Sequence, residues 1–259
     1  MQLAEERRQQ IVDMVDQQGK VLAAELALRF QTSEDTIRRD LRELDAAGLL
    51  RRVHGGAMRR TRAEPSFGQR VDDAGARKAM LAQALLGAVR PGDTMLVDAG
   101  TTNLAFARLL EDGQAAAVIT NSPQIALALG ELRKTKVMLL GGIYAGHAGA
   151  VLGAHTVDAI RQLRVNLAVV GVCSVEADRG LGASDADEAA VKQAMLAAAS
   201  RRVVAVLNER LEAPAPFLIA PLQEADQLVL EADCPPEVLE RLRQLDPTPD
   251  IQLAAKVKA

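Results

Sequence analysis

The sequence contains almost no aromatic residues: it has no tryptophan, one tyrosine and four phenylalanines among 259 residues. Hydrophobic residues still make up 49% of the chain and charged residues 25%, as in an ordinary soluble globular protein. Its cores must therefore be built from alanine, leucine and valine. Proteins that grip single-stranded nucleic acid stack the bases on aromatic rings, so the scarcity of rings argues against that mode of binding.

Cysteines and long hydrophobic runs are also scarce. Cys173 and Cys234 lie far apart without metal-ligand spacing, and His147 and His155 are isolated, so we expect no metal site and no cofactor. No run approaches the roughly 20 apolar residues of a membrane helix. The charged segment Met1–Arg8 does not resemble a signal peptide, and we expect a cytoplasmic protein.

Positive charge is concentrated in one place. The formal net charge of −3 does not by itself suggest a nucleic-acid partner, but residues 51–62 hold five arginines and no acidic residue. A chain of this length accommodates a small domain and a medium one. The basic stretch therefore belongs beside the first, small domain.

The first sixty residues have the pattern of a winged helix-turn-helix. Apolar residues at helical spacing predict helices over 5–16, 21–30 and 34–47, the last beginning at the N-cap Ser33. The Gly55-Gly56 pair predicts a turn between two short strands. Three short helices followed by a small hairpin are typical of DNA-binding domains that place the third helix in the major groove.

The third helix is the candidate reader of duplex DNA. Its apolar stripe, Ile37, Leu41 and Leu44, should face the core, so that its arginines point elsewhere. Arginine recognises guanine through two hydrogen bonds, and flanking side chains contact phosphates. We predict DNA contacts, with Thr36 and Arg38 or Arg39 at the bases, through Ser33, Thr36, Arg38, Arg39, Arg42, Arg51, Arg52 and His54. Three arginines alone would more simply be a solvated helix face.

The rest of the chain alternates short apolar strands with helices, which predicts a Rossmann-like, mostly parallel α/β domain. We expect strands over 94–97, 117–120, 137–140, 167–172, 203–207 and 227–230, and helices over 76–89, 103–110, 123–129, 155–163, 185–199 and 236–245. The resulting domains are 1–58 for DNA binding, 59–75 as a linker, 76–250 for effector binding and oligomerisation, and 251–259 as a tail.

Small and hydroxyl-bearing residues follow three of the predicted strands. In open α/β sheets ligands bind at the carboxyl ends of the strands, and a helix N-terminus there suits an anion. We predict effector contacts through Asp98, Gly100, Thr101, Thr102, Asn121, Ser122, Gly141, Gly142, Asp187, Glu188 and Lys192. Gly-Thr-Thr loops are also common strand–helix turns, and Glu188 and Lys192 are spaced as an ordinary helical ion pair.

Two sets of motifs resemble those of the DeoR family of bacterial regulators. Thr36-Ile37-Arg38-Arg39-Asp40-Leu41, followed by Arg52-Val53-His54-Gly55-Gly56-Ala57, resembles the family's N-terminal signature. Asp98-Ala99-Gly100-Thr101-Thr102, Ile119-Thr120-Asn121-Ser122, Leu140-Gly141-Gly142 and Asp187–Lys192 resemble its sensor domain. The resemblance covers nearly the whole chain.

This resemblance implies an oligomeric repressor of sugar catabolism. It also implies a sensor domain similar to ribose-5-phosphate isomerase and CoA-transferase folds, with a phosphorylated sugar as effector and double-stranded operator DNA as partner. The chain departs from the family at Asn166, at Ala145-Gly146 and at Asn208-Glu209-Arg210, where an Asp-Ser-Ser-Lys-like segment is common. These departures weaken transfer of the usual effector and leave the DNA-binding half untouched.

Two other functions are compatible with parts of the sequence. One is a phosphosugar isomerase or acyl-CoA transferase with an added head, in which Asp98, Asp187 or Glu188 acts as the base. The other is an architectural DNA-binding protein whose α/β domain only oligomerises. The DNA-binding head makes sensing a better explanation of the second domain than turnover, and we expect no enzyme activity.

Overall fold

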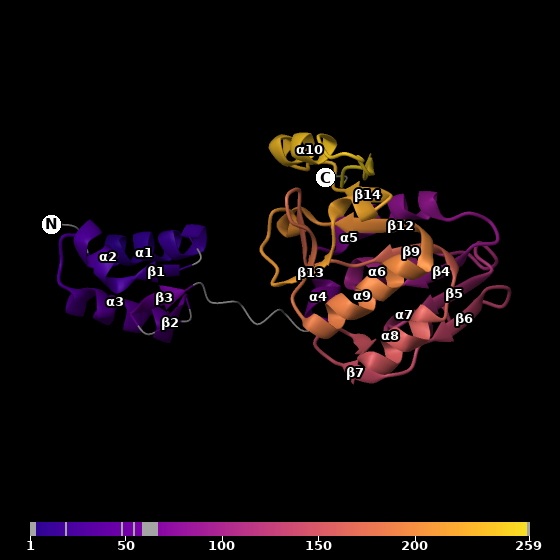
Figure 1. Cartoon of the computed structure of the whole chain (residues 1–259), viewed down its shortest axis with the longest axis horizontal. Helices are drawn as coiled ribbons and strands as arrows, with labels where there is room; N and C mark the ends of the chain where they lie inside the picture. Colours follow the sequence, from indigo (N-terminus) through magenta and orange to yellow (C-terminus); the bar gives the residue numbers. More distant parts are fainter. Residues whose placement is uncertain (1–3, 19, 48, 54, 59–66, 258–259) are drawn as a thin grey trace. The chain divides into compact units, whose positions relative to one another are not determined.

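The computed structural model describes residues 4–18, 20–47, 49–53, 55–58 and 67–257. The chain divides into two compact units, Met1–Glu64 and Pro65–Ala259, each with its own hydrophobic core (Figure 1). Within the described residues, no helix is both long enough and apolar enough to cross a membrane.

The first unit is a helical domain with a small sheet. Its elements are α1 (Ala4–Gln18), β1 (Lys20–Leu22), α2 (Ala23–Arg29), α3 (Glu34–Ala46), β2 (Arg51–Val53) and β3 (Gly56–Met58). The strands form an antiparallel sheet in the order β1-β3-β2, which confirms the predicted hairpin and adds a strand to it.

The prediction of one helix over residues 21–30 is wrong at its start. Lys20–Leu22 is the strand β1, and only Ala23–Arg29 is helical. The reason is tertiary: β1 pairs with β3, where a Cβ on Gly56 would lie 2.1 Å from the carbonyl oxygen of Val21. The glycine thus allows a close backbone approach that helical periodicity does not reveal.

One face of the third helix, α3, packs against the core of the first unit. Ile37, Leu41 and Leu44 are buried in the core of the first unit, as predicted. Asp40 is also buried, and its two carboxylate oxygens accept hydrogen bonds from Arg7 Nε at 2.7 Å and Arg8 Nε at 3.1 Å. Apolar packing and charge pairing with α1 together fix the rotation of α3 about its axis.

The second unit contains a seven-stranded, all-parallel sheet in the order β15-β14-β12-β9-β4-β5-β6. Its strands are β4 (Thr94–Val97), β5 (Ala117–Thr120), β6 (Lys136–Leu139), β9 (Val165–Val170), β12 (Ala199–Val206), β14 (Gln227–Leu230) and β15 (Asp250–Leu253). The strands β4, β5 and β14 coincide with the predicted ranges.

Helices cover both faces of this sheet, as the Rossmann-like prediction requires. The chain forms α4 (Phe67–Asp72), α5 (Gly75–Leu85), α6 (Thr101–Ala107), α7 (Pro123–Ala128), α8 (Ala154–Arg161), α9 (Ala186–Ala198) and α10 (Pro236–Arg243), with short 3-10 turns at Leu86–Ala88, Asn208–Arg210 and Leu222–Glu224.

Neighbouring residues of the central strands point to opposite layers. Met95 and Val97 of β4 pack with α5, α6 and α7, whereas Leu96 packs with α8, α9 and α10. Residues on β9 alternate in the same way. Because both faces are buried, the strands read as continuous apolar runs.

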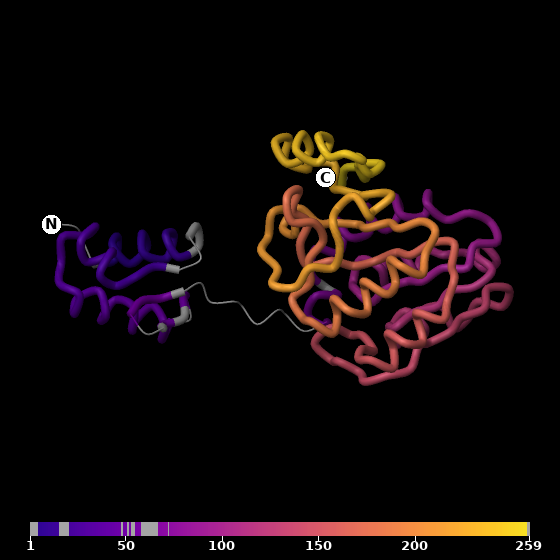
Figure 2. The backbone as a smooth tube through the Cα atoms, in the orientation of Figure 1, coloured from indigo at the N-terminus to yellow at the C-terminus, as the bar shows by residue number. Residues whose placement is uncertain are grey.

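Two expected domain boundaries need correction. The range 59–75 was predicted to be a linker, but Phe67–Asp72 forms α4, with Phe67 buried among the helices of the second unit. The range 251–259 was predicted to be a tail, but Asp250–Leu253 is the edge strand β15, parallel to β14. The C-terminal segment returns from α10 to lie beside β14 (Figure 2).

Several short strands outside the main sheet were not predicted. They are β7 (Ile143–Ala145) and β8 (Ala150–Leu152), which form a hairpin, and β10 (Ser174–Glu176), β11 (Gly180–Ala183) and β13 (Phe217–Ala220), which form a small antiparallel sheet. Strands of three or four residues are too short to show alternation, so their partners decide their conformation.

The order of the strands creates a topological switch point. From β4 the chain builds outward through β5 and β6, whereas β9, β12, β14 and β15 build outward on the other side. β4 and β9 are therefore neighbours whose following loops leave in opposite directions. In open α/β sheets ligands bind in the crevice outside the carboxyl ends of such strands.

Candidate functional site

The predicted DNA-reading face of α3 is exposed. Arg38, Arg39 and Arg42 all point away from the core, on the side of the helix opposite the buried Ile37 and Leu41. The Arg38 side chain is 55% exposed, and its Nη2 donates to Glu34 Oε2 at 2.8 Å. An exposed pair of this kind is worth little, so the guanidinium can exchange it for DNA at small cost.

The start of α3 is fixed by the predicted cap. The backbone N–H of Thr36 donates to Ser33 Oγ at 3.2 Å, and the two hydroxyls lie 2.9 Å apart. On the hairpin, Arg52 is exposed. His54 and the side chain of Arg51 lie outside the described residues, so their predicted contacts with DNA stay predictions.

The predicted effector residues partly converge on a cleft at the switch point. An inner pocket of about 60 Å³ is lined by Asp98, Gly100, Glu188 and Lys192, together with Cys173 after β9. An outer pocket of about 110 Å³ is lined by Gly100, Thr101, Thr102, Lys78 and Arg210, among others. Arg70, Gly100, Gly171 and Val172 line both pockets, which we call together the central cleft.

Asp98 and Lys192 form a buried ion pair beneath the inner pocket. Lys192 Nζ donates to Asp98 Oδ2 at 2.5 Å, and their side chains are 6% and 1% exposed. Asn121 Nδ2 donates to Asp98 Oδ1 at 3.2 Å, and the N–H of Gly171 to Oδ2 at 3.0 Å. Burial disfavours the charge of Lys192, but Asp98 and Glu188 outweigh burial and raise its pKa.

Glu188 is the less firmly held acid of this cluster. Its side chain is 12% exposed, 3.7 Å from Lys192 Nζ and 4.0 Å from His147 Nε2. It therefore offers carboxylate oxygens to the inner pocket. Asp187, predicted beside it, is exposed and lines neither pocket; its backbone N–H donates to the N-cap Asp185.

The outer pocket combines hydroxyl groups with three cations and two carboxylates, those of Asp73 and Glu209. Gly100 has a φ of 142°, which favours glycine and lets the chain turn from β4 into α6. Thr101 and Thr102 follow it and line the pocket together with Lys78 and Arg210. Burial lowers the pKa of Lys78, and Asp73 partly offsets this effect. Its ammonium donates to the backbone carbonyls of Arg70 and Asp73.

Arg70, Lys78 and Arg210 were missed by the sequence analysis. Arg70 lies in the range predicted to be a linker, Lys78 is on the helix α5, and Arg210 was noticed only as part of a departure from the family. No local pattern marks them, because the fold of distant segments brings them to the same cleft.

Asn121 and Ser122 lie beneath the cleft and line neither of its pockets. Both have 0% exposed surface. Asn121 Oδ1 accepts from the N–H of Ala99 at 2.9 Å, and Ser122 Oγ caps α7 and donates to the carbonyl of Gly149 at 3.3 Å. Their side chains hold the loop after β4 and the hairpin β7–β8 in place.

Gly141 and Gly142 also lie outside the central cleft, and their surroundings differ. A Cβ on Gly142 would lie 2.1 Å from Thr156 Oγ1 and 2.8 Å from the carbonyl oxygen of Leu152, and its φ is 148°. A Cβ on Gly141 would only touch the His155 ring at 3.8 Å. Gly142 is thus required for close packing of the loop after β6 against α8.

We expect Gly142→Ala to destabilise the second unit by roughly 1–3 kcal/mol, because the added methyl group overlaps backbone and strains φ. Gly141→Ala is the matched control and should change stability by less than about 0.5 kcal/mol. Urea unfolding of both variants measures this difference. Equal stability of the two variants would contradict the packing role of Gly142.

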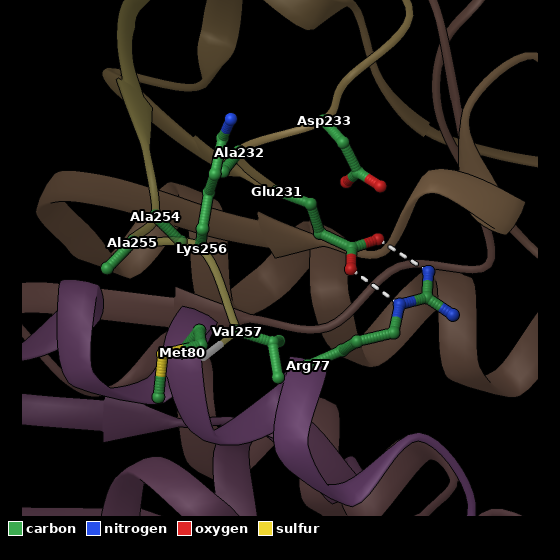
Figure 3. Close-up of a pocket in the computed structure, with 9 residues that line it drawn as sticks. All are labelled: Arg77, Met80, Glu231, Ala232, Asp233, Ala254, Ala255, Lys256 and Val257. Atoms are coloured by element: carbon green, nitrogen blue, oxygen red, sulfur yellow. Dashed lines mark hydrogen bonds and ion pairs between the residues drawn. The ribbon is translucent and has the colours of Figure 1, made fainter. Parts of the chain in front are cut away.

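A separate cavity of about 320 Å³ lies at the carboxyl ends of β14 and β15 (Figure 3). There Arg77 donates from Nε and Nη2 to the two oxygens of Glu231, both at 2.6 Å, and also reaches Glu209 at 2.6 Å. Glu231 accepts in addition from the N–H of Asn208. The Arg77 guanidinium bridges these two carboxylates and joins α5 to the end of β14, a structural role.

Comparison with known proteins gives matches over both units. The family described as "DeoR C terminal sensor domain" matches residues 74–232, and "DeoR-like helix-turn-helix domain" matches residues 7–63. A "Putative aga operon transcriptional repressor" of Escherichia coli O157:H7 is 28% identical over 243 residues, covering 92% of this chain and 90% of that protein. The "Glycerol-3-phosphate regulon repressor" of Escherichia coli K12 is 27% identical, with 92% and 94% covered.

Among solved structures, ribose 5 phosphate isomerase A from Neisseria gonorrhoeae aligns with 52% of this chain and 52% of its own, with a TM-score of 0.38 and 11% identity. The names of both protein relatives given above describe repressors.

Proposed function

The chain belongs to the DeoR family of transcriptional regulators, and from this premise we propose that it represses a carbon-catabolic operon under the control of a phosphorylated sugar. The first unit is the DNA-binding domain of this family and the second its sensor domain. The main observation in favour of DNA binding is the exposed face of α3, where Arg38, Arg39 and Arg42 lie opposite the buried stripe.

The effector of this proposal occupies the central cleft. Thr101 and Thr102 supply hydroxyl donors, and Lys78, Arg70 and Arg210 supply positive charge for a phosphate group in the outer pocket. Glu188 and the Asp98–Lys192 pair bound the inner pocket, where carboxylate oxygens accept hydrogen bonds from sugar hydroxyls. The two pockets adjoin, because four residues line both of them, so one small ligand can reach both.

The proposal also includes the association of two or more chains. Helix-turn-helix regulators bind two half-sites as dimers, because one recognition helix contacts too few bases for high specificity. Effector binding changes operator affinity only if the effector binds the two states of the paired protein unequally. We therefore propose a homo-oligomer with an operator made of repeated or inverted half-sites.

The effector site is tested by thermal shift against pentose, hexose and triose phosphates. A ligand at 100 times its Kd stabilises the protein by about 2.7 kcal/mol, which raises the Tm of a unit of this size by roughly 5–10 °C. Thr101→Val or Thr102→Val should weaken binding ~10-fold or more, because each loses a hydrogen bond to a charged phosphate.

The matched control is Thr94→Val, at the amino end of β4 and so at the opposite edge of the sheet. It should bind the same ligand as the unmodified chain does. Absence of any shift with every sugar phosphate would favour the architectural alternative, in which the second unit only oligomerises. Turnover of a sugar phosphate would instead favour the isomerase alternative.

A further inference from the structure

The cavity at the carboxyl ends of β14 and β15 has an apolar side and a charged side. In the view of Figure 3, Met80 and Val257 lie at its lower side, and Asp233 and Lys256 at its upper side. Its volume of about 320 Å³ exceeds that of both pockets of the central cleft. Pockets for small molecules combine apolar walls with a few placed polar groups. The cavity therefore has the composition of a second binding site.

The charged side chains of this cavity differ in how they are paired. Arg77 and Glu231 are joined by two hydrogen bonds of 2.6 Å. In contrast, Asp233 and Lys256 form no ion pair with each other or with any other residue that the structure describes. Asp233 Oδ1 accepts only from a neutral donor, Asn208 Nδ2, at 2.9 Å. One carboxylate and one ammonium group are thus left to bind a ligand.

The charge around this cavity does not suit a phosphate. Arg77 is held by two carboxylates, those of Glu231 and Glu209, so its guanidinium has little positive charge to offer an anion. Together with Asp233, these make three carboxylates against two cations, Arg77 and Lys256, among the described residues. Like charges repel, so a phosphate dianion is disfavoured. A ligand with both an ammonium and a carboxylate group matches the two unpaired charges, and an aliphatic side chain matches the apolar side.

A single 3-10 turn, which begins at Asn208, connects this cavity to the central cleft. The backbone N–H of Asn208 donates to Glu231 Oε2 at 2.6 Å, and its Nδ2 donates to Asp233. The next residue, Glu209, lines the outer pocket of the cleft and accepts from Arg77 Nη2 at 2.6 Å. The turn therefore contacts both sites, and a ligand that displaces Asp233 also acts on the outer pocket.

We propose that this cavity binds an aliphatic α-amino acid. Asp233 receives its ammonium group, Lys256 its carboxylate, and the apolar side of the cavity its side chain. The match to the sensor-domain family ends at residue 232, whereas Asp233 and residues 254–257 lie beyond it, so the site is not carried over from that match.

Occupation of the cavity also changes the affinity of the central cleft for the sugar phosphate, and this second part of the inference rests on the proposed function. The contacts of the turn with both sites are its basis. Because coupling between two sites is reciprocal, the sugar phosphate must change the affinity for the amino acid by the same factor.

The test is isothermal titration calorimetry of the full chain with L-leucine, L-valine and L-methionine. Asp233→Asn and Lys256→Gln should each weaken the tightest of these complexes ~10-fold or more, because each loses a hydrogen bond between charged groups. Both side chains are exposed, so the variants should fold. Asp158→Asn, which changes a carboxylate 65% exposed on α8 of the same unit, is the matched control and should bind like the unmodified chain.

Two analogues test the requirement for opposite charges. Isoamylamine is leucine without its carboxylate, and 4-methylpentanoate is leucine without its ammonium group. Each should bind ~10-fold or more weakly than leucine, because one charged contact is lost. If either analogue binds as tightly as leucine, the assignment of an amino acid is overturned.

The remaining outcomes separate this inference from the proposed function. No binding of any of the three amino acids overturns the site, even where sugar phosphates and DNA bind. Amino-acid binding that Asp233→Asn and Lys256→Gln leave unchanged overturns its location. Amino-acid binding without any binding of sugar phosphates rejects the proposed effector and keeps the site.

The coupling is measured by titrating the sugar phosphate with and without a saturating amount of the amino acid. We expect its Kd to change by about 5-fold or more. Equal Kd values in the two titrations would overturn the coupling through the turn.

Discussion

Replacing Arg38 and Arg39 together by alanine is expected to weaken sequence-specific DNA binding severely. Both side chains are exposed on α3, and each bidentate contact of an arginine with a guanine contributes about 1–3 kcal/mol of discrimination. The double variant should therefore bind the upstream region of its own gene ~100-fold or more weakly. Its affinity should also depend less steeply on salt, because fewer phosphates are neutralised.

The control for this experiment is Arg161→Ala. Arg161 is 69% exposed on α8 of the second unit, where it pairs with Asp158, so its loss removes the same charge without touching α3. Circular dichroism and Tm should show that both proteins are folded, because neither α3 arginine packs in the core. Unchanged operator affinity in the double variant would remove the basis for assigning α3 as the recognition helix.

Replacing Asp98 by asparagine is expected to cost more stability than any exposed change in the second unit. The substitution leaves Lys192, only 6% exposed, without its main counter-ion. Removing one partner of a buried ion pair typically costs about 3–5 kcal/mol. For a unit of this size that corresponds to a fall in Tm of roughly 6–20 °C.

Two variants control for this effect. The double variant Asp98→Asn, Lys192→Met removes both charges and should recover much of the loss. Asp158→Asn removes an exposed partner of Arg161 and should cost less than about 1 kcal/mol. If the Tm of Asp98→Asn falls by no more than that of Asp158→Asn, the buried ion pair contributes little to the stability of the second unit.

The same pair predicts an alkaline loss of stability. Burial opposes the charge of Lys192, but its ion pairs raise its folded-state pKa above the ordinary lysine value of 10.5. The stabilisation is therefore fully present below pH 10.5 and is lost as the pH rises from there through the folded-state pKa. Urea unfolding between pH 9 and 11 should show a smaller decline in Asp98→Asn than in the unmodified chain.

The sequence predicted the elements whose signals are local. The buried stripe of α3 follows from periodicity, the N-cap Ser33 from capping and the range of β4 from a short apolar run, each within a few residues. The loop Asp98–Thr102 was placed at the carboxyl end of its strand for the same reason. These features depend on near neighbours, so one stretch of chain carries all the information.

The failures occurred where a distant partner sets the conformation. Lys20–Leu22 has helical periodicity but forms a strand because β3 pairs with it, and Asp250–Leu253 is ordered because β14 offers an edge. The segment Phe67–Asp72 resembles a linker because it has few apolar residues. It is nevertheless helical, because those residues pack into the core of the second unit.

The sequence by itself determined the family, the two-unit organisation, the buried and exposed faces of α3 and the position of the loop Asp98–Thr102 at the end of its strand. Only the tertiary structure decided that β4 and β9 are neighbours, that Lys192 pairs with Asp98, and that Asn121 and Ser122 lie beneath the cleft. It also brought Arg70, Lys78 and Arg210 to the outer pocket. The physical reason is that helices and turns are specified by contacts along a few residues, whereas strand order and burial depend on pairings between segments far apart in the chain.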